Sequence, residues 1–227
     1  MTRLAVVSGT GRGLGRAIAE ELLDAGWAVI GLERRPGEKP EPRPGLTVIR
    51  HDVRAEVPAA LHAAIGDRAV DLLVNNAAQG APGGGVQDAD PGAVLRSVDI
   101  AVAGPMRLVA ALLPSLRRAS RPVIVNISSR LGSVTAQARG DFDGFGTSYA
   151  YRISKAAQNM LTVSLAQELS PPIRVLAVHP GRLRTEMGRV GADKDPAVAA
   201  RELLALVDSD DARSPRFCSL GEPDLEW

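Results

Sequence analysis

Residues 4–15, LAVVSGTGRGLG, join a short apolar run to a turn built largely of glycine. The run Leu4–Ser8 is almost wholly apolar, which predicts a buried strand. Apolar residues along one side of residues 14–25 predict a helix that ends at Gly26. Glycines let a chain turn tightly and approach a pyrophosphate, and a helix N-terminus offers N–H groups and positive potential. The stretch therefore predicts a strand–turn–helix unit that binds a dinucleotide, although a glycine-rich turn alone is a common feature.

The same alternation of apolar runs and helical patterns continues along the chain. Further strands are predicted at residues 27–32, 46–50, 71–75, 122–128, 173–178 and 216–219. Helices are predicted at residues 57–65, 93–117 (broken at Pro105 and Pro114), 149–169 and 196–207, and loops at 33–45, 79–91 and 131–147. Apolar strands that alternate with helices form parallel sheets covered on both faces. The expected fold is α/β, a Rossmann-type doubly wound parallel sheet in a single three-layer domain over residues 1–227.

Composition narrows the class of protein. The chain has 227 residues, a formal net charge of +1, 45% hydrophobic and 23% charged residues, which suits one globular domain. The nearly neutral charge predicts neither nucleic acid nor a membrane as a partner, and no apolar run approaches the ~20 residues that span a bilayer. A single cysteine, Cys218, excludes an intramolecular disulfide, and no signal peptide is evident. We expect a cytoplasmic protein, and the sequence predicts no metal site.

The end of the second predicted strand bears on the type of dinucleotide. Glu33 follows Gly9 by 24 positions, near where an acidic group accepts from the ribose 2′-hydroxyl of NAD. Arg12, Arg34 and Arg35 could instead neutralise the 2′-phosphate of NADP. A carboxylate that faces a phosphate is costly unless it swings away, so the sequence slightly favours NAD. An ordinary solvated loop at residues 33–35 is the alternative.

Both tyrosines of the chain lie in the stretch YAYRISK at residues 149–155. A helix turns by about 100° per residue, so Tyr151 and Lys155 share a face, whereas Tyr149 lies roughly opposite Lys155. A neighbouring ammonium favours the phenolate and lowers a phenol pKa from its ordinary value of about 10. A tyrosine tuned in this way can exchange a proton with a carbonyl or an alcohol near neutral pH. Helical phase thus selects Tyr151 as the candidate general acid/base.

Six short motifs in one order resemble the short-chain dehydrogenase/reductase family over nearly the whole chain. They are SGTGRGLG at 8–15, Asp52-Val53, NNAA at 75–78, NISS at 126–129, YRISK at 151–155 and HPGRLRT at 179–185. Each motif is modest alone, but their order and spacing are specific. The phrase YAYRISKAAQN and the C-terminal residues are more narrowly similar to the C-factor/sniffer-like carbonyl reductase branch.

The resemblance implies an NAD(P)-dependent oxidoreductase that interconverts a small-molecule carbonyl and an alcohol by hydride transfer. Tyr151 would be the general acid/base, Lys155 would lower its pKa and bind the nicotinamide ribose, and Ser129 (alternatively Ser128) would bind the substrate oxygen. The implied dinucleotide-binding residues are Gly9, Thr10, Arg12, Gly13, Leu14 and Gly15 in the turn, Glu33, Arg34, Asp52, Val53, Asn75 and Ala77 at the adenosine end, and Pro180, Gly181, Leu183 and Thr185 with Tyr151 and Lys155 at the nicotinamide end. A short substrate lid is expected near residues 186–208. Family members usually form homodimers or homotetramers through helices that correspond to residues 93–117 and 149–169.

Three departures from the family pattern bear on function. Ala78 replaces the last glycine of the family's NNAG, a mild change. Ala101 replaces an asparagine whose backbone carbonyl holds a water in a proton relay to the lysine. Pro105 lacks the N–H that would bond that carbonyl, so we expect the relay water to remain at Ala101. Asp99 is the other residue that could replace the missing asparagine.

The third departure is the separation of Ser129 and Tyr151, which is 22 positions and exceeds the family's usual spacing. The additional residues, 132–146, could shape substrate entry through Phe142 and Phe145 or form a surface hairpin. Because a fold does not fix a function, two alternatives stay open. One is a nucleotide-binding regulatory protein with weak catalysis, and the other is a non-redox lyase or isomerase.

Overall fold

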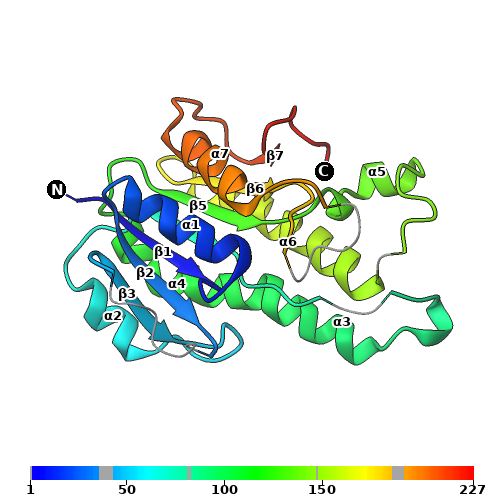
Figure 1. Ribbon diagram of the computed structural model, residues 1–227, viewed down its shortest axis with the longest axis horizontal. Helices are drawn as coiled ribbons and strands as arrows, with labels where there is room; N and C mark the ends of the chain where they lie inside the picture. Colours follow the sequence, from blue (N-terminus) through cyan, green and yellow to red (C-terminus); the bar gives the residue numbers. More distant parts are fainter. Residues whose placement is uncertain (1, 36–42, 81–82, 147, 186–191) are drawn as a thin grey trace.

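Seven strands form one parallel sheet in the order β3-β2-β1-β4-β5-β6-β7 (Figure 1). The computed structural model describes residues 2–35, 43–80, 83–146, 148–185 and 192–227. The strands are β1 (Leu4–Ser8), β2 (Ala28–Glu33), β3 (Leu46–Arg50), β4 (Leu72–Asn75), β5 (Val123–Ile127), β6 (Arg174–His179) and β7 (Arg216–Ser219). The strand order reverses between β1 and β4, and ligands bind at the carboxyl edge beside such a reversal. The predicted Rossmann-type sheet is confirmed.

Helices cover both faces of the sheet, as Figure 1 shows. The α-helices are α1 (Gly13–Asp24), α2 (Ala59–Ile65), α3 (Pro91–Val98), α4 (Gly104–Leu116), α5 (Val134–Ala138), α6 (Tyr149–Leu169) and α7 (Pro196–Asp208). The shorter helical segments are η1 (Val86–Asp88), η2 (Asp99–Ala103) and η3 (Arg130–Gly132). Helices α1 and α7 pack together on one face, and α2, α4 and α6 lie on the other.

The apolar strands fill two cores, one on each side of the sheet. Successive side chains of a strand point to opposite faces, so Ala5 and Val7 of β1 join the core under α1 and α7. Leu4 and Val6 of the same strand join the core under α2, α4 and α6. Because both faces are buried, the strands read as continuous apolar runs rather than as alternating ones.

The helix at residues 91–116 differs from the prediction of a helix broken at two prolines. Pro114 remains inside α4, and Pro105 stands in its first turn, where a missing N–H is tolerated. The preceding segment η2 is π-helical, and Gly104 N–H bonds the carbonyl of Asp99. By length and composition alone, the helix over residues 91–116 could cross a membrane, and 44% of its apolar window is buried inside the fold.

Two other expectations need correction. The predicted loop at 131–147 contains η3 and α5, each begun by a serine whose hydroxyl accepts a backbone N–H: Ser129 for η3 and Ser133 for α5. The predicted lid at 186–208 includes α7, whose Ala199, Ala200 and Leu203 are buried against the sheet. That helix therefore belongs to the core layer. Residues 186–191 of the expected lid, and residues 36–42 of the loop expected at 33–45, lie outside the described residues.

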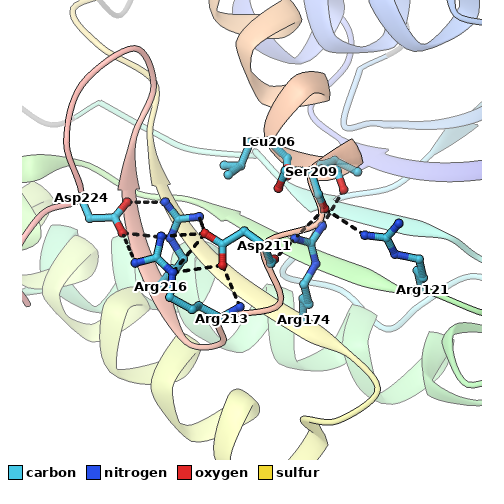
Figure 2. Close-up of polar contacts among 9 residues, drawn as sticks. Arg121, Arg174, Leu206, Ser209, Asp211, Arg213, Arg216 and Asp224 are labelled. Carbon is cyan, nitrogen blue, oxygen red and sulfur yellow. Dashed lines mark hydrogen bonds and ion pairs between the residues drawn. The ribbon is translucent and has the colours of Figure 1, made fainter.

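Hydrogen bonds from arginine side chains connect β6 and β7 to the segments beside them (Figure 2). Arg174 of β6 donates to the carbonyl of Val207, in the last turn of α7, at 2.5 Å. It also donates to the carbonyl of Asp211, just beyond that helix. Arg216 of β7 bonds Asp211 at 2.7 Å and Asp224 at 2.6 Å. The C-terminal residues run back along β7 and reach α5, where Thr135 N–H bonds the carbonyl of Trp227 at 3.0 Å. This tail therefore supports the segment that follows β5.

Candidate active site

The glycine-rich turn between β1 and α1 is packed too closely for side chains. Gly9 and Gly13 have φ values of +77° and +56°, which favour glycine. A Cβ on Gly15 would lie 2.1 Å from the carbonyl oxygen of Gly9, so α1 can approach the turn only with glycine there. The N-terminus of this twelve-residue helix consequently faces the turn with its unbonded N–H groups, an arrangement suited to a pyrophosphate.

Ser8 and Asn76 brace this turn, a function that the sequence did not assign to them. The amide of Asn76 donates to the carbonyls of Ser8 at 2.9 Å and Gly9 at 3.2 Å. The Ser8 hydroxyl accepts from the backbone N–H groups of Asn76 and Ala77 at 3.0 and 3.1 Å. Adjacent polar residues at the ends of two paired strands were the available signal. The turn is therefore held from β4 as well as from β1.

Asn75, in contrast, turns into the sheet. It is 2% exposed, and its amide nitrogen donates to Asn126 of β5 at 2.8 Å. Its Oδ1 is buried without a hydrogen-bond partner in the described part of the chain. Asn126 donates in turn to Thr162 of α6 at 2.9 Å. The resemblance implied that Asn75 meets the adenosine ribose. Its side chain instead links β4 to β5 and, through Asn126, to α6.

The carboxylate of Glu33 lies beside the glycine turn, 7% exposed. Thr10 Oγ1 donates to its Oε1 at 3.0 Å, and a Cβ on Gly11 would lie 3.4 Å from its Oε2. The following residues, Arg34 and Arg35, are exposed. The structure therefore fixes the acid at the place predicted for ribose selection and leaves the arginines at the surface.

Asp52 and Val53 follow β3 as predicted. Arg54 holds the Asp52 carboxylate with two hydrogen bonds, at 3.1 and 2.7 Å, and lowers its pKa to about 2. Val53 is buried and packs against Gly104, where a Cβ would approach to 3.0 Å. Both residues thus have fixed side-chain contacts directly after β3, and their assignment to the adenine stays a prediction.

The segment after β6 lies against the glycine turn. A Cβ on Gly13 would meet the Thr185 methyl at 3.5 Å, so the two ends of the cradle are neighbours. Gly181 has φ +93° and sits over Lys194, whose Cδ would be 2.7 Å from a Cβ there. Leu183 pairs with Lys194 in an isolated bridge. Lys194, which sequence reasoning missed, therefore supports the residues expected at the nicotinamide end.

The Ser129 hydroxyl lies close enough to the Tyr151 phenol to lower the phenol pKa, against the effect of burial. Ser128, the alternative serine, instead donates to Asn159 of α6 at 2.6 Å, which commits it to the core. Tyr149 is 46% exposed, in keeping with helical phase. The structure thus brings together Ser129 and Tyr151, the pair that the sequence favoured.

The ammonium of Lys155 lies near the Tyr151 ring but donates its hydrogen bonds elsewhere. Its Nζ donates to the carbonyl of Ile127 at 2.6 Å and to Oε1 of Gln158 at 2.9 Å, and it lies 5.9 Å from the Tyr151 ring centroid. Burial raises the Tyr151 pKa, and only the nearby Ser129 hydroxyl opposes this rise. Burial also lowers the Lys155 pKa to about 8. In this structure the ammonium is bonded to acceptors other than the phenol, and the expected lowering of the phenol pKa by Lys155 stays a prediction.

Ala101 lies in the π-helical segment η2 and is 4% exposed. Single π-helical turns within α-helices are frequent at functional sites. Asp99, the rival substitute for the missing asparagine, bonds Arg107 at 3.0 Å. That ion pair gives Asp99 a structural partner away from Lys155, which leaves the backbone at Ala101 as the candidate for the proton relay.

The residues between η3 and α6 carry two of the chain's three phenylalanines. Phe142 and Phe145 meet edge to face, with ring centroids 6.4 Å apart. Arg152 of α6 holds their segment by donating to the carbonyl of Phe145 at 2.5 Å and to Gln137 at 3.1 Å. Arg130, directly after Ser129, lies 5.8 Å from the Phe142 ring centroid. The described part of the inserted segment thus contains η3 and α5 and is contacted by Arg130 and Arg152. It does not form a hairpin.

The described residues fit a dinucleotide. A glycine cradle that a Cβ would fill lies at a helix N-terminus, an acid stands where a ribose is expected, and the segment expected at the nicotinamide meets Gly13. Comparisons agree with this fit. The sequence model for the family described as short chain dehydrogenase matches residues 3–195. The chain belongs to the short-chain dehydrogenase family.

Individual relatives show which members of the short-chain dehydrogenase family this chain is similar to. The protein C-signal of Myxococcus xanthus is 33% identical over 161 residues, which cover 70% of this chain and 93% of that protein. Carbonyl reductase (NADPH) 2 of Sus scrofa is 32% identical over 202 residues, with 87% and 78% coverage. The carbonyl reductase Sniffer of D. melanogaster, at 24% identity, superposes with a TM-score of 0.87 over 100% of both chains.

These likenesses confirm the C-factor/sniffer-like type. Family and site together define an oxidoreductase that uses a nicotinamide dinucleotide. The relative named for NADPH gives no support to a preference for NAD.

Proposed function

We propose that this protein interconverts a small carbonyl compound and its alcohol, with Tyr151 as general acid/base. The observation that supports the proposal is that the buried Tyr151 phenol lies beside the Ser129 hydroxyl, on the same helix as Lys155 and one turn before it. The nicotinamide supplies or accepts the hydride when the cofactor is bound. The protein's own groups then have to hold the carbonyl oxygen and move one proton.

Each residue of the site has one task in this scheme. The Ser129 hydroxyl orients the substrate oxygen, and the Tyr151 hydroxyl donates a proton to it during reduction. Burial keeps the phenol protonated at neutral pH, which suits a proton donor. Lys155 is the residue that we assign to the nicotinamide ribose, where its charge would support the phenolate after proton transfer. We assign the proton path behind Lys155 to a water held by the carbonyl of Ala101.

NAD is the cofactor that we favour, against the NADPH in the name of one relative. Glu33 is buried and bonded to Thr10, so it cannot swing away from a 2′-phosphate without losing that bond. Binding of NADH and NADPH should be titrated by fluorescence with the wild type and with Glu33→Gln. Tighter binding of NADPH than of NADH by the wild type would overturn this preference.

We also propose a homo-oligomer and a cytoplasmic location. Helices α3, α4 and α6 carry exposed large apolar side chains, a feature of interaction surfaces; they are Leu95, Met106, Ile153 and Met160. The buried, unpaired Cys218 suits a reducing compartment. Sedimentation at several concentrations tests the first proposal, and imaging in the native cell tests the second.

Carbonyl substrates screened at 340 nm with wild type and Tyr151→Phe test the reaction itself. We expect dinucleotide oxidation that the variant loses by a factor of 10² or more, since general acid catalysis contributes roughly that much. The alternative functions are not supported by the comparisons. Dinucleotide binding without turnover on any carbonyl or alcohol would favour a regulatory protein, and turnover without a change at 340 nm would favour a lyase or isomerase.

A further inference from the structure

Arg130 differs from the other half-buried arginines of this protein. Each of the others donates a hydrogen bond to a carboxylate, a carbonyl or an amide oxygen; they are Arg43, Arg107, Arg152, Arg174 and Arg216 (the last two in Figure 2). Arg130 has neither a hydrogen bond nor an ion pair among the described residues, and its guanidinium carbon lies 5.8 Å from the Phe142 ring centroid. A charged group that is partly removed from water is costly unless it is paired. The guanidinium therefore lacks the anion that its surroundings call for.

The position of Arg130 places this charge at the reacting end of the site. It directly follows Ser129 at the start of η3, and Phe142 belongs to the segment inserted before Tyr151. Its charge also acts on His179, which ends β6 just before the segment expected at the nicotinamide. The ends of β5 and β6 are joined there by the bond from Ser128 N–H to the carbonyl of Val178, at 2.7 Å. Arg130 is thus the residue next to the serine that we assign to the substrate oxygen, on the side of the inserted segment.

Of the two cations in this corner, Arg130 and Lys194, only Arg130 has no acidic partner among the described residues. Glu222 is the acid that acts on His179, but its carboxylate accepts from Ser219 at 2.8 Å and forms no ion pair with Arg130 in the described structure. Lys194, the other cation that acts on His179, is paired with Glu202. His179 is 6% exposed, and its Nδ1 has no partner among the described residues. The guanidinium of Arg130, which directly follows Ser129, thus remains without an ion pair in the described structure.

We propose that Arg130 binds a carboxylate on the substrate, so that the natural substrate pair is an oxo acid and its hydroxy acid. The inference rests on the proposed oxidoreductase function. A planar guanidinium offers two parallel N–H groups to a carboxylate, and Phe142 restricts its orientation from one side. One guanidinium matches the single charge of a carboxylate better than the double charge of a phosphate. The reaction is the proposed one: hydride from the reduced dinucleotide to the carbonyl carbon, and a proton from Tyr151 to the oxygen.

Short oxo carboxylates of increasing chain length, each beside its methyl ester, provide the test. For the best acid, we expect kcat/KM to exceed that of its ester about 10- to 100-fold, because hydrogen bonds to a charged group are strong. Arg130→Gln should abolish this preference while the ester is turned over as before, and Arg130→Lys should retain part of it. Arg139→Gln removes an exposed arginine of the same segment, one paired with Asp141 and Glu226, and should change nothing.

An equal ratio of acid to ester in wild type and Arg130→Gln would overturn the proposal, as would the same loss in Arg139→Gln. Binding of the acids to the protein loaded with reduced dinucleotide, followed by nicotinamide fluorescence, gives the same comparison without turnover. Failure of the oxidoreductase function would appear separately, as an absence of dinucleotide oxidation with every acid and every ester. Selective binding of acids that Arg130→Gln abolishes would support the Arg130 site even then.

Discussion

The stability of the dinucleotide-free protein should depend on pH through Lys155. Burial lowers its pKa from the ordinary 10.5 to about 8, so between these values the unfolded chain binds more protons than the folded protein. Below pH 8 the fold carries a buried ammonium and the stability due to this lysine is lowest. That stability rises as the pH increases from 8 to 10.5. A difference of about 2.5 pKa units corresponds to about 3 kcal/mol in full.

Urea unfolding of wild type and Lys155→Met at pH 7, 8, 9 and 10 measures this effect. Methionine also removes the bonds to Ile127 and Gln158, and this loss changes the free energy of unfolding by the same amount at every pH. Only the slope is therefore diagnostic. The free energy of unfolding of wild type, relative to the variant, should rise by about 2 to 3 kcal/mol between pH 7 and 10. Groups present in both proteins, such as Cys218, cancel in the difference. A difference that stays flat would refute the assignment of a buried, charged lysine.

Three further predictions concern single residues. Gly15→Ala would place a Cβ 2.1 Å from the Gly9 carbonyl, so dinucleotide binding should be lost, whereas Gly85→Ala, with nothing within 4 Å, should bind normally in a fluorescence titration. Gln158→Met removes an acceptor of the Lys155 ammonium and should lower the Lys155 pKa further; the alkaline limit of dinucleotide binding would then move to lower pH, and an unchanged limit would argue against this coupling. Cys218 is 2% exposed and its pKa is raised to about 11 by burial, so a thiol reagent at pH 8 should react with it only after unfolding.

Strand positions followed directly from the sequence because a parallel sheet buries both faces. The apolar runs at β1, β3 and β7 were predicted with the observed bounds, and helix α6 as well. The break expected at Pro114 does not occur, because the helix remains packed on the sheet around it. Helix α5 was missed because it is only five residues long, and serine caps and tail contacts stabilise it more than any apolar periodicity does.

Side-chain direction within the site was harder to predict than residue identity. Helical phase could separate the two tyrosines because both lie on one helix, and Tyr149 is indeed the exposed one. The sequence could not show that Asn75 turns inward while Asn76 clamps the glycine turn, because successive strand residues face opposite ways and the register decides which side is the core. It also could not show that Gln158 and a β5 carbonyl compete for Lys155, because these contacts depend on packing between α6 and the sheet.

The most direct test of the account compares the two tyrosines of YAYRISK. Oxidation of reduced dinucleotide at 340 nm, with the best carbonyl substrate, should be measured for wild type, Tyr151→Phe and Tyr149→Phe. Each variant loses one phenol hydroxyl, and Tyr149 is 46% exposed. We expect Tyr151→Phe to lose kcat by a factor of about 10² or more with dinucleotide affinity retained, and Tyr149→Phe to remain within about threefold of wild type. Equal activity of Tyr151→Phe and wild type would contradict the assignment of Tyr151 as the proton donor.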